Sequence, residues 1–192
     1  MDPINIIIGI NIIALFGANV GGAKKGLKSS ISQVRERSKT KLQQAPPYLA
    51  TFVLLLAIIW LFPIGAIDYL PQYLKFRVPA LVIYLAFSWI QVLAYRQLGD
   101  NYSQEIVIFK NHKLVQSGLY RIIRHPQYTA QIITDIALIT ALMNYVAIPF
   151  VVAEIPLFVM RASFEDKLMR RIFPDDFESY KSKTGFMIPF IG

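Results

Sequence analysis

Residues 42–67 read LQQAPPYLATFVLLLAIIWLFPIGAI and contain no charged side chain. A helix needs about 20 consecutive apolar residues to cross the hydrocarbon core of a bilayer, and the core of this run, Tyr48–Ala66, satisfies that requirement. The whole chain has the same character: 55% of its residues are apolar, 17% are charged, and its mean hydropathy is +0.45. This composition excludes a disordered chain and argues against an ordinary water-soluble enzyme.

Further apolar runs predict four more membrane helices, at Pro3–Ala23, Val78–Tyr95, 127–143 and 147–162. The first run follows Asp2 without a basic segment or a cleavage motif, which argues against a signal peptide. We therefore predict an all-α, polytopic membrane protein with five transmembrane helices, a long polar loop and a C-terminal helical tail.

Lysine and arginine are distributed unevenly among the segments that connect these helices. The first connection carries seven of them, the second two, the polar loop five, the hairpin tip none, and the tail from Arg161 onward six. Basic loops face the cytoplasm, so we expect the N-terminus outside and the C-terminus in the cytoplasm. We assign the net charge of +8 to these loops and to anionic membrane lipid, and we expect no nucleic-acid partner.

The two halves of the chain differ in their predicted role. Residues 1–95 hold three spans and a basic cytoplasmic loop, 24–46, which is compatible with a surface helix or with a solvated loop. Residues 96–192 comprise the polar loop 96–127, a helical hairpin 127–162 and a tail 163–192, and they carry the candidate catalytic region. There is no cysteine, and the two histidines match no zinc spacing, so we expect no metal.

An ordered set of motifs in the second half is more specific than composition. It runs through His112-Lys113-Leu114-Val115, Ser117-Gly118-Leu119-Tyr120, Arg124-His125-Pro126-Gln127-Tyr128, Arg161-x3-Glu165-Asp166, Phe173-x6-Tyr180 and Ile188-Pro189-Phe190-Ile191. This set resembles the isoprenylcysteine carboxyl methyltransferase family, whose wider group includes membrane phospholipid methyltransferases and some sterol reductases. The chain departs from the family pattern at Ala130, where glycine is usual, and at Asp166, where a second glutamate is usual.

The resemblance implies an S-adenosylmethionine-dependent methyltransferase with a cytoplasmic cofactor-binding loop. It implies Arg161 as the catalytic residue that binds an acceptor carboxylate, and Glu165 as the partner of the cofactor's ammonium group. It also implies that the cofactor is lined by His112, Lys113, Leu114, Val115, Tyr120, His125, Pro126, Gln127 and Tyr128. The implied acceptor is lipophilic, such as a prenylated C-terminal cysteine, and enters from the bilayer. Guanidinium–carboxylate, carboxylate–ammonium and aromatic–sulfonium pairings suit these roles.

Several alternatives stay open from the sequence. A phospholipid N-methyltransferase would need a base to remove a proton from its amine, and Glu105, Glu154 or His125 could serve. A membrane reductase using NADPH and a non-enzymatic transporter are further alternatives, which cofactor binding would distinguish. Asp135 and Glu154 lie inside the predicted hairpin, where carboxylates are costly and are usually paired or functional. Glu154 could pair with Arg161.

The predicted topology can be tested by cysteine labelling, because the chain has no cysteine of its own. We expect Ser32→Cys and Ser117→Cys to react with a membrane-impermeant maleimide only from the cytoplasmic side, since both lie in basic loops. Labelling of Ser117→Cys from the outer side would place the polar loop on the wrong face of the membrane.

Overall fold

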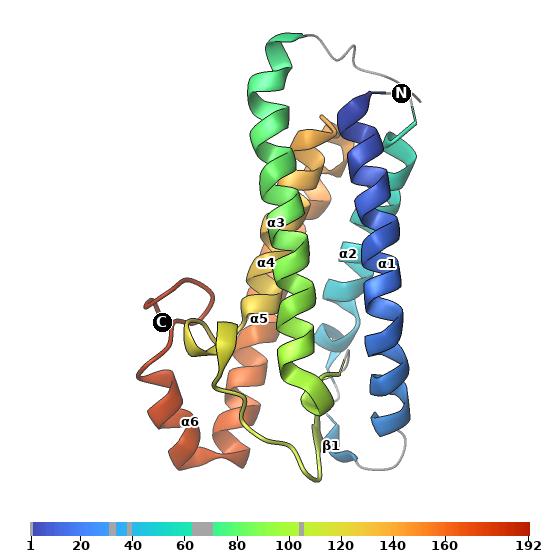
Figure 1. Cartoon of the computed structure of the whole chain (residues 1–192). Coiled ribbons are helices and arrows are strands. Elements are labelled where there is room, and N and C mark those ends of the chain that lie inside the picture. Colours follow the sequence, from blue (N-terminus) through green and yellow to red (C-terminus); the bar gives the residue numbers. More distant parts are fainter. Residues whose placement is uncertain (1, 31–33, 38–39, 63–70, 104–105) are drawn as a thin grey trace.

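The computed structural model describes residues 2–30, 34–37, 40–62, 71–103 and 106–192, with the backbone alone at 19–30 and 34–37. Five long helices run alternately up and down in a bundle, and a short sixth helix lies at one end (Figure 1). The described elements are, in order, α1 Pro3–Ser30, β1 Val34–Arg37, α2 Ala45–Trp60, α3 Leu74–Leu98, β2 Val107–Phe109, α4 Pro126–Ala141, α5 Ile148–Ile172 and α6 Pro174–Lys181. The all-α prediction is confirmed, apart from the two short strands.

Within the described residues, three helical stretches are long and apolar enough to cross a membrane: Lys41–Trp60, Pro71–Asn101 and Tyr145–Ile172. The apolar helix Pro3–Ala18 is shorter. Large apolar side chains lie on the outside of the bundle, among them Ile13, which is 75% exposed, and Phe16, which is 74% exposed. Water does not favour such a surface, whereas lipid does. The chain is therefore an integral, multi-pass membrane protein.

The helix boundaries differ from the predicted ones in both directions. α1 continues to Ser30 and α3 begins at Leu74. α2 ends at Trp60, and the remainder of its predicted span, 63–66, lies outside the described residues. The largest difference is in α5, which continues to Ile172 instead of ending near 162.

The extra turns of α5 are stabilised by packing. Their apolar side chains form a cluster with the segment around β2, in which Leu168 is buried against Ile106 and Ile108. A polar-looking stretch thus remains helical because one side of it is covered. As a result, Arg161 and Glu165 lie on one continuous helix.

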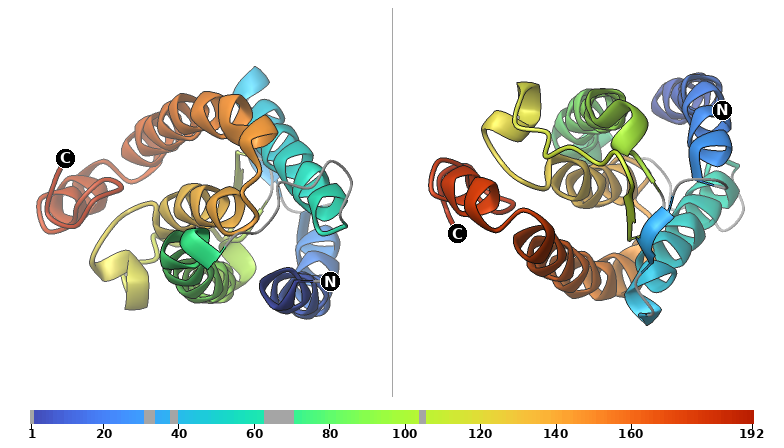
Figure 2. Two further views of the ribbon diagram at one scale, coloured as in Figure 1. Left: turned by 90° about the horizontal axis from the view of Figure 1, so that it is seen from above. Right: turned by 90° about the horizontal axis from the view of Figure 1, so that it is seen from below.

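The basic loop 24–46 is neither a single surface helix nor a plain loop. α1 occupies its first part, and β1 then pairs antiparallel with β2, with Val34 opposite Phe109. The strand pair joins the basic loop to the polar loop at the end of the bundle where α6 lies (Figure 1). Views along the bundle show α4 beside α3, with α5 and α2 along another side (Figure 2).

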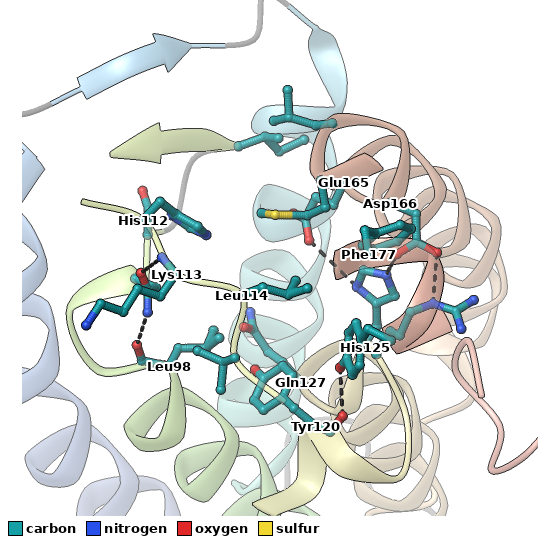
Figure 3. A pocket seen from close by; sticks show the side chains of 18 of the residues that line it. Leu98, His112, Lys113, Leu114, Tyr120, His125, Gln127, Glu165, Asp166 and Phe177 are labelled. Atoms are coloured by element: carbon teal, nitrogen blue, oxygen red, sulfur yellow. Dashed lines mark hydrogen bonds and ion pairs between the residues drawn. The ribbon is translucent and has the colours of Figure 1, made fainter. Parts of the chain in front are cut away.

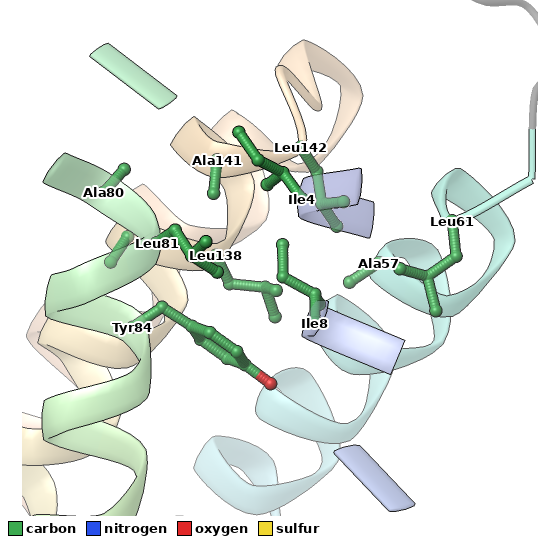
Figure 4. Packing of buried hydrophobic residues seen from close by; sticks show 11 residues of the cluster. Ile4, Ile8, Ala57, Leu61, Ala80, Leu81, Tyr84, Leu138, Ala141 and Leu142 are labelled. Carbon is green, nitrogen blue, oxygen red and sulfur yellow. The ribbon is translucent and has the colours of Figure 1, made fainter. Parts of the chain in front are cut away.

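A buried apolar cluster holds the opposite end of the bundle (Figure 4). It packs four helices, α1, α2, α3 and α4, against one another. Its members are Ile4, Ile8, Ala57, Leu61, Ala80, Leu81, Tyr84, Ala137, Leu138, Ala141 and Leu142. Close packing of this kind fixes helix positions, because a change of even one methylene is felt. The helices therefore leave the cluster in set directions and bring the polar segments together at the other end.

Arg77, which is 1% exposed, connects three helices beside this cluster. Its Nη1 and Nη2 donate hydrogen bonds to the two carboxylate oxygens of Asp2, at 3.0 and 2.8 Å. Its Nε donates to the Ala141 carbonyl at 2.8 Å, and its Nη2 also donates to Asn5 Oδ1 at 3.1 Å. These hydrogen bonds hold the pKa of the Asp2 carboxyl below its usual value. The start of α1, α3 and the end of α4 are thereby tied at one point.

Arg77→Ala should destabilise the protein by about 3–5 kcal/mol, the usual cost of removing one partner of a buried ion pair. Thermal unfolding in detergent would measure the effect. Lys75→Ala is the matched control, because Lys75 is exposed and lies only over the Phe76 ring, 5.0 Å from its centroid. Equal melting temperatures for the two variants would show that the Arg77 contacts do not support the bundle.

Candidate active site

Two cavities meet where the polar loop, the start of α4 and the lower half of α5 come together. We call the first the loop-side cavity (Figure 3); its walls include His112, Lys113, Leu114, Val115, Tyr120, His125, Glu165 and Phe177. The second, the bundle cavity, has a volume of about 370 Å³; its walls include Phe16, Leu54, Gln91, Gln131, Asp135, Phe158 and Arg161. Gln127 and Tyr128 line both cavities.

The residues predicted to bind the cofactor are brought together by the fold. All of them line the loop-side cavity except Pro126, which is the first residue of α4 and sets the start of that helix. Arg161, predicted to bind the acceptor, lines the bundle cavity instead. Arg161 and Glu165 are one turn apart on α5, yet they contribute to different cavities.

The Tyr128 hydroxyl lies at the junction of the two cavities. It donates a hydrogen bond to Glu165 Oε1 and accepts one from Arg161 Nε at 2.8 Å. Arg161 Nε also lies 3.4 Å from Glu165 Oε1, and Arg161 Nη1 donates to the backbone carbonyls of Gln43, at 2.7 Å, and Leu42, at 3.2 Å. Arg161 thus also ties α5 to the segment before α2. We therefore expect it to contribute more to stability than an ion pair on the protein surface does.

A second set of polar contacts holds the start of α4 in place. Arg124 Nε donates to Asp166 Oδ2 at 3.0 Å, and His125 Nε2 lies 2.8 Å from Asp166 Oδ1. Arg124 Nη1 donates to the Thr184 carbonyl at 2.7 Å. The His125 ring stacks nearly parallel to Tyr128, with centroids 5.8 Å apart. Asp166 therefore positions the Arg124-His125 turn, because each of its carboxylate oxygens contacts one of these two side chains.

His112 presents an unsatisfied polar atom to the loop-side cavity. Its Nδ1 is buried, and none of the described residues hydrogen-bonds to it. Burial lowers the pKa of His112 below its ordinary value, so the ring is neutral at pH 7. Aromatic side chains hold the ring, with Phe109 at 6.2 Å and Phe173 at 6.3 Å between centroids. A buried polar atom without a partner indicates a place for a ligand.

α6 closes the loop-side cavity from the tail side. Phe177 and Tyr180 line the cavity, and Phe177 is buried. The Tyr180 hydroxyl donates a hydrogen bond of 2.7 Å to the Tyr120 carbonyl, across from α6 to the polar loop. This contact fixes α6 over the cavity.

Sequence reasoning missed part of both cavities. Asn101, Ile106 and Val107 also line the loop-side cavity. No motif marks them: Asn101 lies in the turn after α3, and Val107 pairs with Arg37 of β1, which is a tertiary contact. Gln91 and Gln131 line the bundle cavity. Their signal was present, since both are polar residues within apolar helical runs.

Comparison with known proteins gives a consistent result. Residues 80–171 match the model of the isoprenylcysteine carboxyl methyltransferase family. A probable protein-S-isoprenylcysteine O-methyltransferase of Oryza sativa subsp. indica is 29% identical over 114 residues, which is 58% of this chain and 60% of the relative. Protein-S-isoprenylcysteine O-methyltransferase B of Arabidopsis thaliana is 30% identical over 83 residues, 43% of this chain and 42% of the relative. The chain belongs to the isoprenylcysteine carboxyl methyltransferase family.

A solved structure supports the same family fold. The eukaryotic intramembrane Ras methyltransferase of this family matches with a TM-score of 0.59 at 22% identity, over 77% of this chain and 54% of that one. The chain spans about three fifths or less of the curated relatives it matches. The family resemblance inferred from the Arg124–Tyr128 and Arg161–Asp166 motifs is thereby confirmed.

Proposed function

We propose that this protein transfers a methyl group from S-adenosylmethionine to the carboxylate of a lipophilic acceptor. One observation carries the proposal: a polar cavity and a cavity within the apolar bundle meet at Tyr128, with Glu165 in the wall of the first and Arg161 in the wall of the second. A water-soluble donor and a lipid-soluble acceptor can therefore approach the same point from opposite sides.

The loop-side cavity suits S-adenosylmethionine, whose sulfonium carries the transferable methyl group. Glu165 offers a carboxylate whose side chain is 22% exposed, which suits an ammonium group. The unpartnered His112 Nδ1 suits a polar group of the ligand, and the Tyr120 and Tyr128 rings suit a cation. The buried Phe177 ring adds an apolar surface to the wall of this cavity.

The bundle cavity suits an acceptor that carries a carboxylate on an apolar body. A carboxylate is already ionised at pH 7 and needs no general base, so the protein's contribution is positioning. Arg161 places a positive charge in the wall of this cavity, which attracts a carboxylate, and holding both reactants in place can supply about 7–11 kcal/mol of the barrier. An amine acceptor would need a base at this point. Of the three candidates from the sequence, Glu105 lies outside the described residues, and neither His125 nor Glu154 lines the bundle cavity.

The finer parts of the proposal follow from family membership and charge. Five spans with the N-terminus outside put the loop-side cavity on the cytoplasmic side, because the basic segments lie at that end. The relatives in rice and Arabidopsis are named for a prenylated cysteine substrate, so a prenylcysteine analogue is the first acceptor to test.

Glu165→Gln should weaken S-adenosylmethionine binding by about 2–5 kcal/mol, because a buried ammonium loses its charged partner. Isothermal titration calorimetry in detergent would measure it. Glu178→Gln is the control, since that carboxylate lies on the outside of α6 and pairs with Arg170. Wild-type affinity in Glu165→Gln would remove Glu165 from the cofactor site.

Arg161→Ala should leave S-adenosylmethionine affinity within a few-fold but reduce methyl transfer at least about 100-fold, because the acceptor loses its anchor. It should also lower the melting temperature, since contacts to the Leu42 and Gln43 carbonyls are lost. Arg161→Lys separates the two effects: it keeps the positive charge but cannot form the planar fork, so transfer should stay low. Near-normal turnover in Arg161→Ala would leave the arginine as structural support.

A further inference from the structure

The bundle cavity contains a second polar wall, deeper in the bundle than Arg161. Asp135 and Thr134 line it from α4 and are 3% and 6% exposed. Glu154 on α5 is 1% exposed and does not line the cavity, and neither of its carboxylate oxygens has a hydrogen-bond partner among the described residues. The pair with Arg161 considered from the sequence is therefore not formed.

The wall lies at a defined depth. On α4, Asp135 is two turns from Tyr128, and on the antiparallel α5, Glu154 is two turns from Arg161. The two helices therefore carry two polar levels: Tyr128 with Arg161, and Asp135 with Glu154. Seven residues of helix separate the levels, which is about 10 Å along the axis.

Hydrogen bonds hold the Asp135 carboxyl group at this depth. Gln131 Nε2 donates to Asp135 Oδ2 at 2.7 Å, and Gln91 Nε2 donates to Gln131 Oε1. Gln91 Nε2 also donates to the Tyr95 hydroxyl at 3.0 Å. The network joins α3 to α4, so the carboxyl group is held at the cavity wall by side chains that are themselves positioned.

The Thr134 hydroxyl adds an independent sign of a ligand. Its Oγ1 is buried and has no hydrogen-bond partner in the part of the chain that the structure describes. A buried hydroxyl without a partner destabilises the fold, and carboxyl groups inside a membrane bundle are costly and are usually paired or functional. A wall that contacted only a hydrocarbon tail would need neither group.

We propose that this wall is a subsite for a hydrogen-bond donor, a hydroxyl or an amino group, carried on the apolar body of the acceptor about 10 Å from its carboxylate. The proposal rests on the proposed function, because Arg161 sets the position of the carboxylate. Among lipophilic carboxylic acids, the subsite favours those that carry a polar group part-way along the body. Asp135 accepts the donor's hydrogen bond, and the Thr134 hydroxyl is placed to bond the same group.

Three matched probes test the subsite: a long-chain carboxylic acid, the same acid with a mid-chain hydroxyl, and the same acid with an amino group at that carbon. Calorimetry would measure their affinities for the full chain in lipid nanodiscs with S-adenosylhomocysteine, and methyl transfer would be assayed in parallel. We expect wild type to bind a donor-bearing probe at least about tenfold more tightly than the plain acid, the ratio typical of a hydrogen bond to a charged group.

Thr134→Val and Asp135→Asn should each reduce this preference, the ratio of the affinities for the donor-bearing probe and the plain acid, to within about threefold. A greater loss for the amino probe than for the hydroxyl probe in Asp135→Asn identifies a cationic group. Thr140→Val is the matched control and should keep the wild-type preference, because Thr140 is exposed on the outside of α4 and its hydroxyl donates to the Ile136 carbonyl.

Equal affinity for the three probes, binding of none of them, or a preference that survives both substitutions would overturn the subsite. If Asp135→Asn fails to fold, Thr134→Val, which removes only a hydroxyl, decides the matter. Transfer and binding are read separately. A donor preference without methylation of any probe would contradict the proposed methyl transfer and leave the subsite standing.

Discussion

The hydrogen bonds of the Tyr128 hydroxyl are the contact on which the site depends. In an apolar bundle, a guanidinium and a carboxylate must be paired or they destabilise the fold. Tyr128 links Arg161 to Glu165 and so gives the buried guanidinium and the partly buried carboxylate a common partner, one turn apart on α5. The same side chain lines both cavities. A requirement of burial thus produces the geometry that methyl transfer between a soluble donor and a lipid-borne acceptor requires.

The strongest sequence signals correctly predicted an all-α membrane protein. Long uncharged runs are enough to predict membrane helices, because no soluble core requires them, and the structure has a helix in each run. Boundaries were less predictable where packing decided them. The stretch after Arg161 carries acidic residues followed by basic ones, which favours a polar tail, yet it continues α5 because Leu168 packs against Ile106 and Ile108. The β1–β2 pair joins two loops far apart in the sequence, and nothing local in either loop indicates its partner.

The site was more predictable than its surroundings. The residues of the Arg124–Tyr128 motif, the His112–Val115 segment and Glu165 could be grouped by family resemblance, and the fold gathers all but Pro126 around one cavity. Arg161 and Glu165, for which different roles were predicted, line different cavities, and the roles themselves stay predictions. Asp135 and Glu154 could be noticed but not interpreted, because their meaning depends on α4 and α5 being antiparallel neighbours. Only the fold shows that these two carboxyl groups form a level of their own beneath Tyr128.

The most direct test of the account is an experimental structure of the protein with S-adenosylhomocysteine in a lipid environment. We expect the ligand to lie in the loop-side cavity, with its ammonium group within hydrogen-bond distance of Glu165 and its sulfur directed toward Tyr128 and the bundle cavity. A ligand bound within the bundle cavity, or one that leaves Glu165 without contact, would contradict it.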